Sequence, residues 1–120
     1  MYKNNSLRKR CYYFSLSLIG LMELLPKDKT SYILANQLLR SGTSIGANLV
    51  EATASSSRLE YKKYFEISLK SANETKYWLG LLRDSHKFEP EKVNALLKET
   101  VEIANMIGSA VLKLKRKPII

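Results

Sequence analysis

Apolar residues recur along four stretches of the chain at alternating intervals of four and three positions. The first stretch places the following residues on this spacing: Leu7, Cys11, Phe14, Leu18, Leu21 and Leu25. Such intervals put side chains on one face of an α-helix, whereas a strand would alternate at every second residue. The pattern predicts a helix over about residues 6–25 that ends at Pro26, because proline cannot continue a helix interior.

A second helix is predicted over about residues 31–54, with Asp28 or Thr30 as the candidate N-cap residue. Its middle contains Gly42 and Gly46, and a glycine inside a helix costs roughly 1 kcal/mol relative to alanine. Two interpretations are open: the helix breaks at Gly42, or it continues and its small residues let a neighbouring helix approach closely. We favour the continuous helix, because the third helix carries small residues of its own.

Two more helices follow, over about residues 58–85 and 90–115. Ser57 followed by Glu60 is a capping-box pattern that starts the third helix, and Pro90 is a favoured first residue for the fourth. Within the third helix, Ser68, Ala72 and Thr75 form a stripe of small residues where a tight contact between helices is expected. A basic tail ends the chain.

Four long helices with short connections predict a single all-α domain, residues 1–120, folded as an antiparallel up-down-up-down four-helix bundle. Further apolar positions widen the first and fourth helices beyond the face that one core needs; these are Leu16, Ile19, Leu96, Ile103 and Ala110. A wide apolar surface is typical of an oligomer interface, although a broad single-chain core would use the same residues. We expect a homo-oligomer.

Residues 11–22 are uncharged and follow three basic residues, which is the arrangement of a signal peptide. No small-residue cleavage site follows, and the stretch is shorter than the roughly 20 residues of a membrane span. We therefore expect a cytoplasmic protein with no membrane segment.

Positive charge is in excess: 20 Lys and Arg stand against 11 Asp and Glu, for a formal net charge of +9. An antiparallel bundle brings both termini and the loop between the second and third helices to one end. The bases expected there are Lys3, Arg8, Lys9, Arg10, Arg58, Lys62, Lys63, Lys113, Lys115, Arg116 and Lys117, opposed by Glu60 alone. Such a cluster attracts phosphate backbones, and it predicts a nucleic-acid-binding site; a merely solvated basic end is the alternative.

Four tyrosines, Tyr2, Tyr12, Tyr13 and Tyr61, fall in or near this basic end. Exposed aromatic rings can stack on unpaired bases, but we interpret these tyrosines as packing at the edge of the core.

The chain offers little that could support catalysis. One cysteine and one histidine exclude a disulfide framework and a self-contained zinc site. Cys11 falls on the core spacing, and His86 falls at the end of the third helix, where a cation suits the last carbonyls. We predict no catalytic residue, no metal site and no cofactor.

Arg40, Asn48 and Glu51 lie within or next to the small-residue segment of the second helix. A close contact between helices would bury some of them, and buried charges must be paired. We predict that Arg40 or Asn48 joins a facing glutamate in a polar network inside the bundle or between subunits; ordinary surface positions are the alternative.

The segment from Leu39 to Ala52, with Arg40-Ser41, Ile45, Asn48 and Glu51 in order, resembles the four-helix bundle family of 23S rRNA intervening-sequence proteins, also called S23 ribosomal proteins. The resemblance continues into residues 71–79, where Ser71-Ala72-Asn73-Glu74 is a variant of the family's usual stretch. More distantly the chain is similar to the accessory protein of diversity-generating retroelements. These resemblances imply a bacterial bundle protein that forms a homo-oligomer, specifically a pentamer, with a basic surface for RNA or DNA.

Two functions follow as hypotheses. The first is a non-enzymatic oligomer that binds nucleic acid, RNA above all, through its basic end with little sequence preference. The second is an adaptor or scaffold whose apolar faces recruit a protein partner, with no specific nucleic-acid ligand. A small structural bundle without a ligand is a third.

Overall fold

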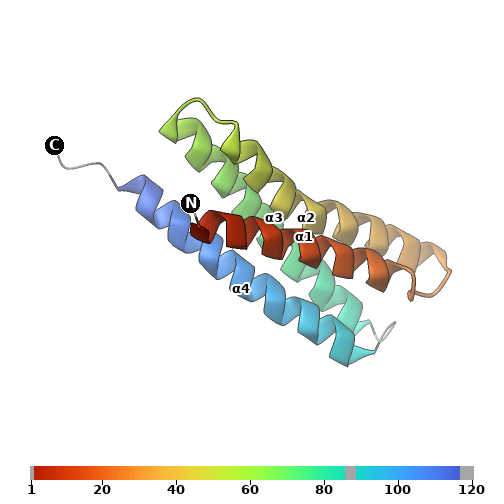
Figure 1. The fold of residues 1–120 in the computed structure, drawn as a ribbon. Coiled ribbons are helices and arrows are strands. Elements are labelled where there is room, and N and C mark those ends of the chain that lie inside the picture. The colour runs from red at the N-terminus through yellow and green to blue at the C-terminus, as the bar shows by residue number, and fades with distance from the viewer. Residues whose placement is uncertain (1, 86–88, 117–120) are drawn as a thin grey trace.

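The protein is described by a computed structural model covering residues 2–85 and 89–116, with side chains described from Ser6 onward. Within these residues it forms four helices, α1 (Tyr2–Met22), α2 (Lys29–Thr53), α3 (Arg58–Asp84) and α4 (Pro90–Lys115). Successive helices run in opposite directions, and each packs on the next, with α1 also lying against α4 (Figure 1). The all-α antiparallel bundle predicted from the apolar spacing is confirmed.

Capping side chains fix most of the helix boundaries. Asp28 caps α2 by accepting a hydrogen bond from the Ser31 amide at 2.9 Å. Ser57 caps α3 by accepting from the Glu60 amide at 3.1 Å, and Glu60 in return accepts from the Ser56 amide at 2.8 Å. The capping box is therefore present, with its return bond one residue earlier than the usual N-cap amide.

Helix α1 ends at Met22, earlier than the expected end next to Pro26. The amides of Leu24 and Leu25 bond to the carbonyls three residues before them, which tightens the chain into a turn. This turn carries Leu25 into the core, where it is buried. Leu25, the residue before Pro26, therefore lies outside the helix, as is usual for a residue that precedes proline.

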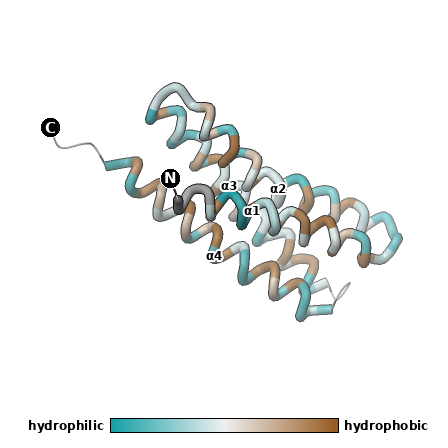
Figure 2. The backbone as a smooth tube through the Cα atoms, viewed as in Figure 1, coloured by the Kyte–Doolittle hydropathy of each residue, from teal (hydrophilic) through white to brown (hydrophobic). Residues whose placement is uncertain are grey.

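The core consists of the predicted face of each helix, and Figure 2 shows apolar positions recurring along all four. The extra apolar positions divide into two groups. On α4, Ile103 is buried, and Leu96 and Ala110 pack against the core from partly buried positions. On α1, Leu16 and Ile19 are exposed. These extra positions on α4 are therefore used within one chain, whereas those on α1 are not.

Helix α2 runs unbroken through Gly42 and Gly46, as the sequence predicted. A Cβ atom at Gly42 would overlap the Leu18 side chain, and one at Gly46 would lie 3.0 Å from the Cβ of Cys11. The lack of a side chain at both glycines therefore allows α1 to pack closely against α2. The close approach expected from the sequence is therefore present, and the neighbouring helix, which the sequence did not identify, is α1 at these two glycines.

No helix in residues 2–85 or 89–116 has the length and apolarity required to span a bilayer.

Candidate nucleic-acid interface

The first half of α1, the loop between α2 and α3 and the last turns of α4 lie toward the same end of the bundle (Figure 1). We call the cationic residues of this region the basic end; its described members are Arg8, Lys9, Arg58, Lys62, Lys63, Lys113, Lys115 and Arg116. Arg8 and Lys62 are partly buried, and the other six are exposed. The gathering of charge follows from the antiparallel order of the helices, as predicted. Lys117 lies outside the described residues, and the side chain of Lys3 is not described.

Arg58 links two elements of the basic end. Its Nη2 donates to the carbonyl oxygens of Lys113 at 3.2 Å and Arg116 at 3.3 Å, at the end of α4. The last carbonyls of a helix lack partners inside the helix and carry the negative end of its dipole, so a cation there is stabilising. Arg58 therefore has a structural role as well as a charge to offer a ligand.

Two acids that the sequence analysis did not count modify the basic end. Glu51 is exposed in the last turn of α2, so it joins Glu60 in this region. Glu66 pairs with Lys62 across one helical turn, with an Nζ–Oε2 distance of 3.6 Å. The excess of positive charge remains, since eight described bases face these three acids.

Arg10 is not available to phosphate in the way the sequence suggested. Its Nε donates to Glu99 at 2.6 Å and its Nη2 to the same carboxylate at 2.8 Å, and Nη2 also pairs with Glu102. Both acids lie on α4, so the ion pairs join α1 to α4. The hydrogen bonds from Arg10 lower the pKa of Glu99, against the opposing effect of burial. Arg10 is thus neutralised within the chain.

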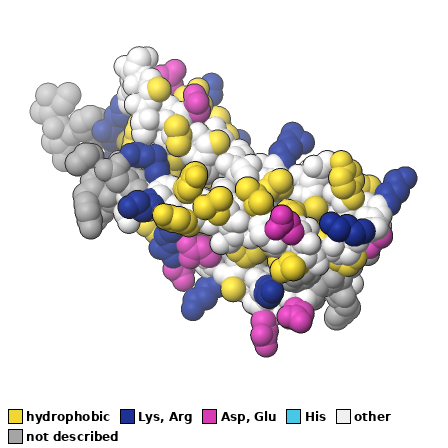
Figure 3. Space-filling model, turned by 45° about the vertical axis from the view of Figure 1, so that its right-hand side comes forward, with side chains coloured by type: hydrophobic (Ala, Val, Ile, Leu, Met, Phe, Trp, Pro, Cys, Tyr) yellow, Lys and Arg dark blue, Asp and Glu magenta, His cyan; other side chains and the backbone are white. Residues whose placement is uncertain are grey.

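Two tyrosines of α1 differ from their predicted environment, and the side chain of Tyr2 lies outside the described residues. Tyr12 and Tyr13 are 64% and 59% exposed, so they do not pack at the edge of the core. Tyr61, in contrast, is partly buried and stacks on Phe65 with ring centroids 4.8 Å apart. Figure 3 shows hydrophobic side chains spread along the middle of the molecular surface.

The predicted network of Arg40, Asn48 and Glu51 does not form within a single chain. Arg40 and Glu51 are exposed, and no ion pair joins either of them to another described residue. Asn48 donates instead to the carbonyl of Ser44 in its own helix at 2.8 Å. A network between subunits stays a prediction.

Hydroxyl groups, not charges, fill the close contact between α2 and α3, which we call the hydroxyl contact. Its three bonds join Ser68 to the Ile45 carbonyl at 2.7 Å, Thr75 to Ser41 at 2.9 Å and Ser71 to Ser44 at 3.0 Å. The tight contact expected at Ser68, Ala72 and Thr75 is therefore present. Short hydroxyl side chains satisfy each other where the backbones are too close for longer polar groups.

Cys11 is buried, as its place on the core spacing predicted. Burial, with a smaller contribution from the Glu99 carboxylate, raises the pKa of its thiol to about 12. At neutral pH the thiol is therefore protonated and unreactive. Among the described residues no group of three His, Cys, Asp or Glu side chains is placed to hold a metal ion, and His86 lies outside them.

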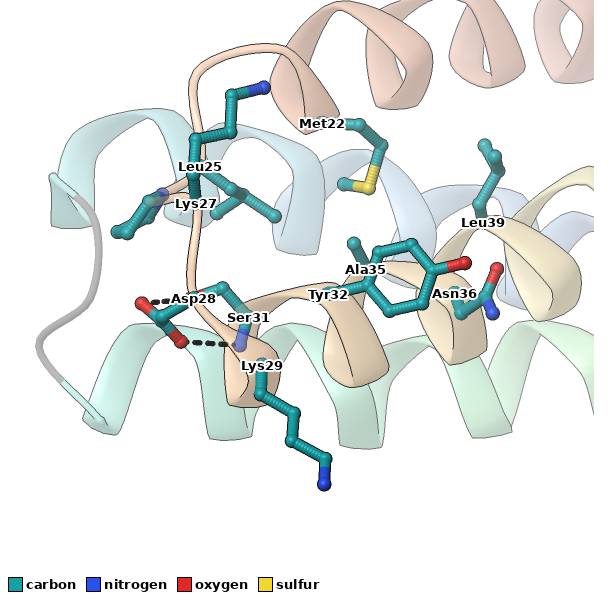
Figure 4. Close-up of a pocket in the computed structure, with 11 residues that line it drawn as sticks. Met22, Leu25, Lys27, Asp28, Lys29, Ser31, Tyr32, Ala35, Asn36 and Leu39 are labelled. Atoms are coloured by element: carbon teal, nitrogen blue, oxygen red, sulfur yellow. Dashed lines mark hydrogen bonds between the residues drawn. The ribbon is translucent and has the colours of Figure 1, made fainter.

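A pocket of about 560 Å³ that the sequence did not indicate lies at the opposite end, beside the turn from α1 to α2 (Figure 4). Met22 and Leu25 line one side of it, and Tyr32, Ala35 and Leu39 on α2 line the other. Asp28 is occupied there by its two hydrogen bonds to Ser31. These mainly apolar walls suit hydrophobic contact and not phosphate.

The sequence comparisons agree with the fold. The family described as 23S rRNA-intervening sequence protein matches residues 3–109. No curated protein matches the chain. The crystal structure of a protein of unknown function from the S23 ribosomal protein family of Bacteroides thetaiotaomicron VPI-5482 is 33% identical, with a TM-score of 0.85 over 92% of this chain and 98% of that one. The chain therefore belongs to the family of 23S rRNA-intervening sequence proteins.

Proposed function

We propose that the protein is a non-enzymatic, cytoplasmic, oligomeric nucleic-acid-binding bundle that holds RNA by its phosphates at the basic end. The observation that carries this proposal is the gathering of exposed cations from three elements, with Lys9 on α1, Lys63 on α3, and Lys113, Lys115 and Arg116 at the end of α4. Their charges gather at one end of the bundle, which attracts a polyanion more strongly than scattered bases do.

The proposed recognition is by charge and shape. Lysines on flexible stems meet phosphates as point charges and do not read base edges. The affinity should therefore fall steeply with salt and depend little on sequence.

Assembly is the second part of the proposal. Leu16 and Ile19 are exposed on α1, where contact with another copy would cover them. Repetition of the basic end around a homo-oligomer, a pentamer by the resemblance described above, would raise affinity through multivalent contact. Sedimentation of the protein at micromolar concentration tests this part, and a single monomeric species would contradict it.

The test of the basic end compares two triple charge reversals. The first changes Lys63, Lys113 and Lys115 to Glu; these residues are exposed and hold no structural bond through their side chains in the described part of the chain. The matched control changes three exposed lysines of the opposite end, Lys27, Lys29 and Lys92, to Glu. Because both variants carry the same net charge, any difference between them reports position.

We expect the first variant to bind a structured RNA at least about tenfold more weakly than the control, with a salt slope reduced by about two. The readout is fluorescence anisotropy of labelled RNA at low and near-physiological salt. Equal binding by the two variants would mean that total charge, and not the basic end, determines affinity. Arg58 is left unchanged, because its loss would also uncap α4.

A protein-binding adaptor is the second candidate, and the pocket beside the turn from α1 to α2 favours it. A binding partner that engages this pocket would stay bound after nuclease treatment and would be released by Ala35→Glu, since Ala35 lines the pocket. Loss of every protein partner on nuclease treatment would reject this candidate.

A further inference from the structure

We propose that Tyr12 and Tyr13 form a stacking platform for unpaired nucleotides, so that the basic end prefers single-stranded RNA to duplex. This inference rests on the proposed nucleic-acid function and specifies its ligand. Both side chains are among the most exposed large apolar groups of α1, and they add nothing to the buried core. Their rings lie edge to face, with centroids 5.8 Å apart and planes inclined by 81°.

The ring geometry selects the ligand. Successive bases in a duplex lie parallel in one continuous stack, and their faces are covered by their neighbours. Two rings at 81° cannot both extend such a stack. Each ring can instead take the face of one base if those bases are splayed apart, and only unpaired nucleotides can be splayed in this way at low cost.

Two sets of charges lie near the rings. Tyr13 lines a pocket together with Arg10 and Glu99, whose charges offset each other in an ion pair. Lys9 is exposed and lies three positions before Tyr12 and four before Tyr13, so it shares their side of the helix. A cation that holds the backbone beside an aromatic ring that holds the base is the combination found in single-strand binding grooves. The platform is thus an extension of the basic end along α1. Tyr12 lies one helical turn before Leu16, so the contact between copies proposed at Leu16 and Ile19 has to end short of Tyr12 for the platform to stay free.

Tyr77 on α3 shows that exposure alone does not make such a site. It is 62% exposed and meets Trp78 edge to face, at 5.2 Å between ring centroids. The turn before it carries Glu74, which accepts a hydrogen bond from the Trp78 indole at 3.0 Å. A carboxylate in this position repels phosphate, so Tyr77 is a control with matched exposure and opposite local charge.

The experiment measures binding of two labelled probes, an oligouridine strand and an RNA duplex of the same length, at fixed near-physiological salt. The variant is Tyr12→Leu with Tyr13→Leu, which keeps apolar area and removes the aromatic faces. Tyr77→Leu is the control, and Tyr12→Phe with Tyr13→Phe tests rescue. Thermal unfolding and sedimentation are recorded for every variant, and the exposed positions predict unchanged melting.

We expect the double leucine variant to lose affinity for oligouridine by at least about tenfold, since stacking on one ring alone gives an effect of that order. Duplex binding should change by less than about twofold, Tyr77→Leu should bind both probes like the wild type, and the phenylalanine variant should keep its affinity for oligouridine.

Three other results would overturn the inference, and they are distinguishable. If the wild type binds neither probe, the proposed function fails together with the platform. If the wild type binds both and the leucine variant keeps its affinity for oligouridine, the function stands and the platform is wrong. If the leucine variant weakens both probes equally and sediments as a smaller species, this face of α1 joins copies of the chain instead of stacking bases.

Discussion

Two helix–helix interfaces of the bundle, α2 with α3 and α1 with α4, are packed in different ways. Between α2 and α3 the hydroxyl contact is closed to the surface, with Ser68 and Thr75 fully buried. Between α1 and α4 the Arg10 ion pairs lie at the surface, and beside them is a pocket of about 340 Å³. The first interface depends on how closely two backbones approach, whereas the second tolerates a gap because long side chains reach across it. Changes in side-chain volume should therefore affect stability at the interface between α2 and α3. Changes in charge should affect it at the interface between α1 and α4.

The largest expected effect comes from added volume. Ala72 is fully buried on the α3 face of the hydroxyl contact, whereas Ala95 lines the pocket between α1 and α4. Ala72→Leu should lower the free energy of unfolding by about 2–3 kcal/mol, because a well-packed contact cannot absorb the extra methylenes. Ala95→Leu should change it by less than about 0.5 kcal/mol. Urea unfolding measures both, and equal costs would erase the distinction between the interfaces.

A smaller effect is expected from removing one hydroxyl. Thr75→Val deletes the bond to Ser41 across the contact and the bond to the Ser71 carbonyl, which should cost about 1 kcal/mol. Thr100 on α4 is equally buried, and among the described residues its hydroxyl bonds to the Leu96 carbonyl of its own helix and to no other helix. Thr100→Val is therefore the control, and its unfolding free energy should fall by less. If Thr100→Val proves the more costly change, the bonds across the hydroxyl contact contribute little to stability.

The smallest effect is expected from the ion pairs. Arg10→Gln should cost about 0.5 kcal/mol at neutral pH, as is usual for partly exposed pairs. Because Arg10 lowers the pKa of Glu99, the stabilisation is present above the pKa of an unfolded glutamate, about 4.3, and is lost as the pH falls through the lower folded value.

The difference between wild type and Arg10→Gln should therefore disappear in acid, and it should also shrink in high salt. Unfolding free energies at neutral and acidic pH provide the comparison. A difference that persists unchanged at acidic pH and in high salt would mean that Arg10 stabilises the bundle by packing, for example against Met106, whose sulfur lies 3.4 Å from its Nη1.

Local patterns predicted most of the fold. The spacing of apolar residues placed all four helices, and Ser57 and Pro90 fixed two of their starts. The end of α1 was missed because the turn after Met22 is set by the need to bury Leu25, which is a tertiary requirement. The sequence also did not show which helix packs against Gly42 and Gly46. The spacing of small residues marks a close contact but does not identify the neighbouring helix.

The sequence predicted the parts of the candidate site that depend only on the order and direction of the helices. It did not predict the contacts that depend on how far one helix is shifted along its neighbour. To predict the basic end, it was enough to know that successive helices run antiparallel. The pairing of Arg10 with Glu99 and Glu102 depends on how far α4 is displaced along α1, which no local pattern encodes. Likewise the exposure of Tyr12 and Tyr13 depends on which side of α1 meets a neighbour within one chain.

The hydroxyl contact has a consequence for the entropy of folding. Serine and alanine have few or no rotamers to lose, so burying Ser68 and Ala72 costs little side-chain conformational entropy, whereas fixing a long side chain such as Arg10 costs up to about 2 kcal/mol. At Ser68 and Ala72, the contact between α2 and α3 therefore forms with little loss of side-chain entropy. Its two helices are joined by the short loop from Ala54 to Ser57, which keeps the entropy of closing that hairpin small as well.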